Sequence, residues 1–209
     1  MRAEGLVAYE VGYRAAPTDD FTWDIAAYFN DYTSLQGFGD PGAPFPDPPP
    51  PNLIFLIPVE FANNTRAQTY GFELTGTYEV NETWRLTGNY SLFEANAQSS
   101  ESPLIDTTVR IIEGGTPHNQ IYVRSSWDWG SDVQFDLIGR YVDSVTALDI
   151  PKYIEMDAVL SWRATKTLDF SLVGQNLLQA HHLEYEDWQT GLHSTEVVRG
   201  VYGMMTLKH

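Results

Sequence analysis

Residues 153–178 alternate between apolar and polar side chains, and this alternation limits the possible fold more than any other feature of the sequence. The apolar series begins with Ile154, Met156, Ala158, Leu160 and Trp162, and the polar series with Glu155, Asp157, Ser161 and Arg163. After a polar stretch at 164–167 the pattern resumes. Successive side chains of a β-strand point to opposite faces. The segment is therefore predicted to form a β-hairpin whose arms have the length of about ten residues that a tilted strand needs to cross a bilayer.

The same period of two recurs along the whole chain. We expect nine strands, at 4–15, 21–32, 60–80, 83–97, 117–128, 132–144, the two arms of 153–178, and 197–209. No run of about 20 apolar residues occurs, so the sequence predicts no transmembrane helix. The N-terminal residues lack the basic and apolar regions of a signal peptide and themselves alternate. We therefore expect the chain to be a fragment of a larger all-β protein.

Composition excludes several classes of function. The 209 residues include no cysteine, so disulfide and thiol chemistry are absent. The formal net charge of −16 argues against binding to nucleic acid through its phosphates. No ordered set of nucleophile, base and acid is recognisable, so we expect no enzyme activity and no cofactor.

Two regularities indicate a membrane barrel. Connections after the odd-numbered strands are short and those after the even-numbered strands are longer, as in bacterial outer-membrane barrels. Four tryptophans on the apolar faces lie within a few residues of the short turns, as an interfacial aromatic girdle requires: Trp23, Trp84, Trp127 and Trp162. A soluble β-sandwich would also alternate, but it would not sort tryptophan by depth.

The number of strands indicates whether the chain can form a complete barrel. In a meander of nine antiparallel strands the first and the last run in the same direction, so closing it would require a parallel pair, whereas single-chain bacterial barrels have even strand numbers. We therefore expect an antiparallel transmembrane β-barrel segment that covers residues 1–209 as one unit and forms the last part of a larger barrel.

Short segments in a consistent order resemble the C-terminal part of TonB-dependent outer-membrane receptors. They are 9–14 (YEVGYR), 70–74 (YGFEL), 89–91 (NYS), 117–120 (PHNQ), 139–143 (GRYVD), 157–160 (DAVL), 174–178 (GQNLL) and 199–203 (RGVYG). The resemblance implies the last nine strands of a 22-stranded barrel with a plugged lumen. It also implies location in the bacterial outer membrane, contact with its lipid, coupling to the TonB system through an absent N-terminal part, and import of a bulky nutrient such as an iron–siderophore complex.

The chain departs from this family at both ends. The family usually ends on an aromatic residue, whereas this sequence ends at His209, which is expected on the lipid face. The plug and the segment that engages TonB are expected to be missing, so the isolated chain is not expected to perform energised transport.

Substrate contacts are expected in the outer loops 33–58, 98–116, 145–152 and 179–196. The candidate aromatic residues are Phe38, Phe45, Phe55 and Trp188. A weaker candidate is a metal site at His181, His182 and Glu184, since imidazole and carboxylate groups ligate metals. The more ordinary interpretation of these three residues is a solvated loop. Pro48–Pro51 is expected to stiffen an outer loop.

Two other functions remain open at this point. A passive pore or adhesin-like barrel without a plug would share the strand pattern. A soluble β-sandwich that acts as a binding module would share the alternation.

Overall fold

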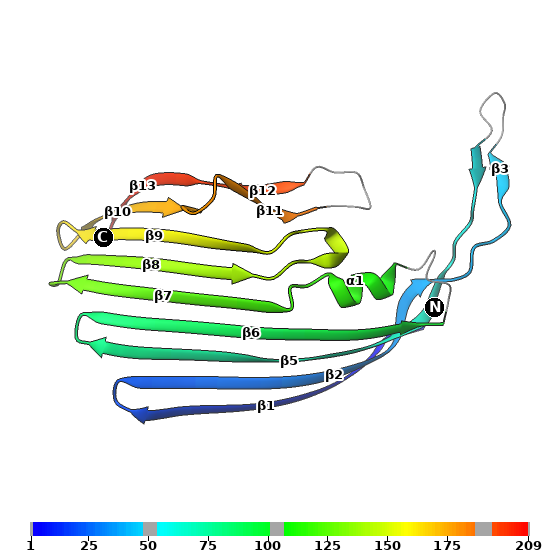
Figure 1. The fold of residues 1–209 in the computed structure, drawn as a ribbon, viewed down its shortest axis with the longest axis horizontal. Helices are drawn as coiled ribbons and strands as arrows, with labels where there is room; N and C mark the ends of the chain where they lie inside the picture. The colour runs from blue at the N-terminus through cyan, green and yellow to red at the C-terminus, as the bar shows by residue number, and fades with distance from the viewer. Residues whose placement is uncertain (1, 48–53, 101–106, 187–193, 209) are drawn as a thin grey trace.

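A computed structural model describes residues 2–47, 54–100, 107–186 and 194–208. Its main feature is one curved sheet of nine antiparallel strands (Figure 1). In sheet order these are β1 (Gly5–Thr18), β2 (Phe21–Phe38), β5 (Phe61–Asn81), β6 (Trp84–Ser99), β7 (Asn119–Trp129), β8 (Val133–Val142), β9 (Tyr153–Arg163), β10 (Leu168–Gln175) and β13 (Gly200–Leu207). Each of these nine strands pairs with the one that precedes it in this order, which confirms the antiparallel meander predicted from the sequence.

The two ends of the sheet differ as expected. Short turns join the strands at one end, and the longer connections gather at the other end (Figure 1). Leu207 of β13 pairs with Leu168, beside the short turn between β9 and β10. The described part of the C-terminus therefore lies at the short-turn end.

The register places tryptophan side chains from different strands in one band. Trp84 and Trp127 are direct cross-strand partners, and their rings stack with centroids 6.2 Å apart. Trp162 likewise pairs with Phe170 at 5.8 Å. Trp23 belongs to the same apolar face near its own short turn and contacts Tyr13. This arrangement matches the aromatic girdle at one interface of a membrane barrel.

The apolar face of the sheet has no protein layer on it in the described residues. Val11 is 71% exposed and Met205 66% exposed, although both are large apolar residues of the outer face. The buried apolar residues are few and mostly small: Ala67, Ala95, Ala97, Val145, Ala147, Ile150 and Val173. A soluble sandwich buries its apolar face against a second sheet. That alternative is therefore wrong for this chain.

The sheet is open. Strands β1 and β13 are its two edges, and the sheet order does not join them. This agrees with the prediction of a barrel segment that does not close on itself.

The longer connections contain more secondary structure than the sequence suggested. They hold β3 (Phe45–Asp47) paired with β4 (Ile54–Leu56), α1 (Thr108–Gly114), the 3-10 helix η1 (Thr146–Leu148), and β11 (His181–Tyr185) paired with β12 (Thr195–Val198). Neither helix among the described residues is long and apolar enough to span a membrane.

Three strand boundaries require correction. Strand β2 continues to Phe38 instead of ending near residue 32, because Leu35, Gly37 and Phe38 still pair with β5 across bulges. Strand β10 ends at Gln175, since Asn176 has a left-handed backbone with φ 50°. The single strand expected at 197–209 is divided: residues 195–198 pair with β11, and only β13 joins the main sheet. Apolar alternation weakens at these strand ends, so the sequence pattern did not reveal them.

Some sequence predictions lie outside the described residues. They concern Trp188, Pro48–Pro51 and His209.

Candidate functional site: the polar face and its upper mouth

The polar face of the sheet carries paired charges. Arg124 on β7 binds Asp136 on β8 through two hydrogen bonds of 3.0 and 2.9 Å. Arg140 on β8 reaches two carboxylates of β9, Glu155 at 3.0 Å and Asp157 at 2.8 Å. Barrel interiors are polar and outer faces apolar. These ion pairs therefore mark the polar face as the lumen wall, and no catalytic set is needed to explain them.

A second polar group lies at the long-connection end, just before β7. Both ring nitrogens of His118 face acceptors: Nδ1 lies 3.2 Å from Glu94 Oε1, and Nε2 lies 3.3 Å from the carbonyl oxygen of Glu113. Only the imidazolium form can donate to both. The hydrogen bond with Glu94 accordingly raises the pKa of His118 above its ordinary value of 6.5.

Asp143, which directly follows β8, has the opposite shift. It accepts hydrogen bonds from the Asn119 side chain at 3.1 Å and from the Ser144 backbone N–H at 2.9 Å. The bond from Asn119 is the largest cause that lowers the pKa of this carboxyl group.

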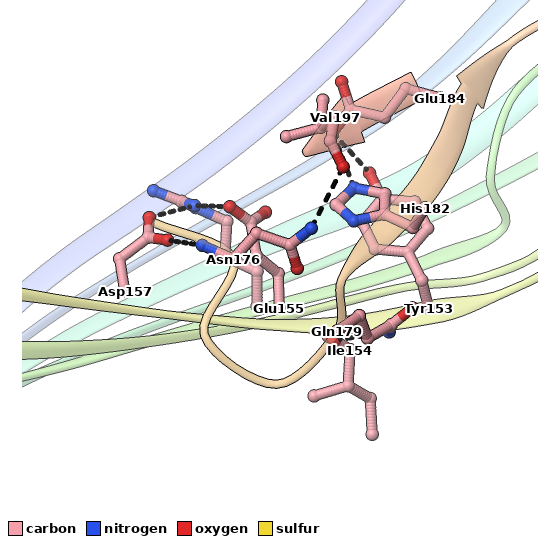
Figure 2. Close-up of polar contacts among 10 residues, drawn as sticks. Tyr153, Ile154, Glu155, Asp157, Asn176, Gln179, His182, Glu184 and Val197 are labelled. Atoms are coloured by element: carbon pink, nitrogen blue, oxygen red, sulfur yellow. Dashed lines mark hydrogen bonds and ion pairs between the residues drawn. The ribbon is translucent and has the colours of Figure 1, made fainter. Parts of the chain in front are cut away.

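The hairpin formed by β11 and β12 brings a further set of polar residues to the start of β9. His182 on β11 stacks on Tyr153, with ring centroids 4.1 Å apart. Its Nε2 lies 3.1 Å from Glu184 Oε1, and the Tyr153 hydroxyl donates to the same oxygen at 3.4 Å. Figure 2 shows these side chains close to Glu155 on the wall. A nitrogen of His182 and one carboxylate oxygen each from Glu155 and Glu184 all lie within 4.8 Å of one another.

Asn176 fixes where this hairpin begins. The residue is fully buried, and its positive φ turns the chain directly after β10. Its backbone N–H donates to Asp157 Oδ1 at 2.9 Å, and its side-chain Nδ2 donates to the carbonyl oxygen of Val197 at 3.0 Å (Figure 2). Asn176 thus links the wall strand β9 to the far strand of the hairpin.

The aromatic residues predicted to contact substrate do not gather into one surface. Phe38 packs on Phe61 at the end of β2, with ring centroids 5.3 Å apart. Phe45 pairs with Leu56, whereas Phe55 pairs with Pro46. Direct partners share a face, so Phe45 and Phe55 point to opposite faces of the hairpin β3–β4. Both are about half exposed, at 48% and 56%.

The three residues considered for metal binding do not all lie on the same face of β11. His182 and Glu184 share one face of β11, while His181 points to the other face and pairs with Glu196 at 3.2 Å. Glu155 takes the third place, although the sequence did not indicate it as a metal ligand. Its position at the start of the polar series of β9 was visible in the sequence, but the fold of the hairpin over that position was not.

Comparison with known proteins identifies the family. A family model described as "TonB dependent receptor-like, beta-barrel" matches residues 2–177. The chain belongs to this family. Its members are transport receptors of the bacterial outer membrane and not enzymes. No curated protein matches the sequence.

Solved structures of TonB-dependent receptors share the fold. The ferric-catecholate import receptor Fiu from E. coli K12 matches 97% of this chain with a TM-score of 0.69 at 15% identity. The ferric yersiniabactin uptake receptor FyuA from Yersinia pestis matches 97% with a TM-score of 0.67 at 16% identity. The copper transporter OprC matches 98% with a TM-score of 0.70 at 14% identity. This TonB-dependent receptor chain spans only 27%, 29% and 31% of those three chains, respectively.

Proposed function

We propose that this chain forms the last nine strands of a plugged, 22-stranded barrel in the bacterial outer membrane. The open sheet edges at β1 and β13 support this proposal, since each edge has unpaired backbone groups that further strands would pair. The outer face supports it as well, because its exposed apolar residues suit lipid contact.

We further propose that the complete barrel imports an iron–siderophore complex with energy from the TonB system. The observation that carries this proposal is the family match over residues 2–177 together with a charged polar wall on the inner face. Fiu is named for ferric-catecholate import, FyuA for ferric yersiniabactin uptake, and OprC is named a copper transporter. The chemical class of the cargo is therefore proposed by analogy with the first two.

The outer connections are the proposed contacts with the siderophore. The hairpin β3–β4 offers exposed aromatic rings at Phe45 and Phe55 on its two faces. Phe38 is assigned a packing role instead, because its ring already contacts Phe61. Trp188 remains a proposed contact from the sequence alone.

Deletion of the gene in the bacterium that encodes it tests the function. Under iron limitation, uptake of ⁵⁵Fe from a panel of ferric siderophores should fall for at least one compound and return on complementation. The same uptake should disappear when TonB is inactivated. Uptake that persists without TonB would indicate a passive pore, and uptake of every compound at the wild-type rate in the deletion strain would refute siderophore import.

A further inference from the structure

We propose that Glu155, His182 and Glu184 form a binding site for a divalent transition-metal cation such as Zn²⁺. The three side chains come from the wall strand β9 and from the hairpin strand β11. The site is distinct from the siderophore cargo and does not depend on the proposed import function.

The separations of the three ligand atoms suit a small cation after a modest closure. Zinc binds nitrogen and oxygen ligands at about 2.0–2.2 Å, so ligand atoms of a tetrahedral site lie roughly 3.3 Å apart. His182 Nε2 and Glu184 Oε1 already lie 3.1 Å apart. One ligand atom from each of the three residues lies within 4.8 Å of the other two, so the set needs to contract by at most about 1.5 Å to complete the coordination.

Burial gives a second and independent indication. His182 is only 6% exposed, and Nδ1, the ring nitrogen that does not face Glu184, has no hydrogen-bond partner among the described residues. Asn176, which donates to Val197, the cross-strand partner of His182, is fully buried, and its Oδ1 also has no partner in the described part of the chain. Buried polar atoms are nearly always paired, and an unpaired one points to an ion or a water molecule. The burial of His182 and of the unpaired Asn176 Oδ1 therefore supports a bound species at this place.

The surroundings would hold the ligands in place. The Tyr153 ring stacks on His182, which fixes the imidazole plane. The Tyr153 hydroxyl donates to Glu184, and Arg140 donates to Glu155 Oε1 at 3.0 Å. Partners of this kind orient ligands and are a regular part of metal sites. Because Arg140 occupies Oε1, the other oxygen of Glu155 is the proposed ligand atom.

The donor set selects the class of cation. One imidazole nitrogen and two carboxylate oxygens suit Zn²⁺ and neighbouring first-row metals. Ca²⁺ and Mg²⁺ prefer oxygen ligands alone and at least six of them. We therefore expect Zn²⁺ to bind and Mg²⁺ to compete poorly. A bound cation would also join the hairpin β11–β12 to the lumen wall.

Calorimetric titration of ZnCl₂ into the whole chain, refolded in detergent and treated with a chelator, tests the site. We expect one equivalent of Zn²⁺ to bind, and an excess of MgCl₂ to leave this binding in place. His182→Gln should weaken binding by at least about 100-fold, since loss of a mere supporting partner already costs 10–100-fold. His181→Gln is the matched control: this neighbouring imidazole is exposed and faces Glu196, so the affinity should not change.

Folding of each variant is checked by far-UV circular dichroism, and Glu184→Gln provides a second ligand variant if His182→Gln does not fold. Co²⁺ in place of Zn²⁺ gives an absorption spectrum that reports coordination directly, and its bands should be lost in either ligand variant. Absence of saturable Zn²⁺ binding would overturn the proposal. Equal weakening by His181→Gln, or unchanged affinity in a folded ligand variant, would overturn it too.

Discussion

Arg124 on β7 and Asp136 on β8 form a bidentate ion pair. Arg124 Nε donates to Asp136 Oδ1 at 3.0 Å, and Arg124 Nη2 donates to Asp136 Oδ2 at 2.9 Å. The Asp136 side chain is only 7% exposed and also accepts a hydrogen bond from the Ser126 hydroxyl. Paired hydrogen bonds between charged groups are stronger than neutral ones. The pair therefore anchors two neighbouring strands on the lumen side.

The first prediction concerns this pair. Asp136→Ala should lower the free energy of unfolding by about 1–3 kcal/mol, because it leaves the Arg124 guanidinium and the Ser126 hydroxyl without their partner. Denaturant unfolding in detergent micelles, followed by tryptophan fluorescence, measures the change.

The matched control is Asp24→Ala on β2. Arg14 and Asp24 also form a cross-strand pair, at 2.6 Å, but the Arg14 side chain is 84% exposed. Exposed pairs contribute at most about 1 kcal/mol. Equal losses in the two variants would show that burial of Asp136 does not strengthen its pair.

The second prediction concerns the two faces of β10. Leu172 lies on the apolar outer face and is 54% exposed, while the adjacent Ser171 faces the polar side and lies 3.2 Å from Ser161. Leu172→Arg should destabilise the protein in phospholipid vesicles by about 2–4 kcal/mol, the cost of a cationic side chain facing the bilayer midplane. Ser171→Arg should lower the stability much less, because the arginine side chain would lie on the polar face of the sheet. A reversed order would mean that the faces are assigned the wrong way round.

Much of the fold was readable from the sequence because the membrane imposes a simple rule on each strand. Apolar and polar residues must alternate wherever one face meets lipid, so the spans of β7, β8 and β9 were predicted within a few residues. Tryptophan placement gave the orientation. Beyond the apolar band this rule no longer applies. The extension of β2 to Phe38 and the whole hairpin β11–β12 therefore had no signal of period two.

The polar groups around the hairpin β11–β12, at the long-connection end of the sheet, were harder to predict for a related reason. His182 and Glu184 stood out in the sequence as possible ligands, but their partner Glu155 is far away along the chain. Only the turn at Asn176 brings the hairpin back to the wall. A single left-handed residue of this kind leaves no periodic trace in a sequence. The aromatic candidates Phe45 and Phe55 were correctly placed in an outer connection, yet their opposite orientation depends on a register that the sequence does not reveal.

The third prediction concerns the pH dependence of the contact between Glu94, near the long-connection end of β6, and His118, which directly precedes β7. The pKa of His118 is raised in the folded state, so the folded state binds the proton more tightly than the unfolded state does. The stability from this contact is therefore fully present below the unfolded pKa of about 6.5 and is lost as the pH rises through the higher folded value. Ring ¹³C NMR of labelled histidine in detergent measures the folded pKa.

Glu94→Gln provides the control for that titration. The variant keeps a side chain of the same size but loses the negative charge, so the pKa of His118 should fall towards 6.5. An unchanged titration midpoint would show that Glu94 is not the main cause of the shift.

The fourth prediction concerns Asn176. Asn176→Ala should loosen the hairpin β11–β12, since alanine tolerates the φ of 50° poorly and cannot donate to the carbonyl oxygen of Val197. The two effects together should cost about 2 kcal/mol. Hydrogen–deuterium exchange should then be more than about tenfold faster at the hairpin amides, while the amides of β7 and β8 keep their rates.

Asn176→Gly separates the two effects. Glycine adopts the left-handed conformation without strain, so this variant loses only the side-chain hydrogen bond to Val197 and should show about half the free-energy change. If glycine and alanine accelerate exchange equally, backbone conformation contributes nothing and the hydrogen bond alone holds the hairpin. If neither variant changes exchange in the hairpin, Asn176 is not the residue that fixes β11–β12 to the lumen wall.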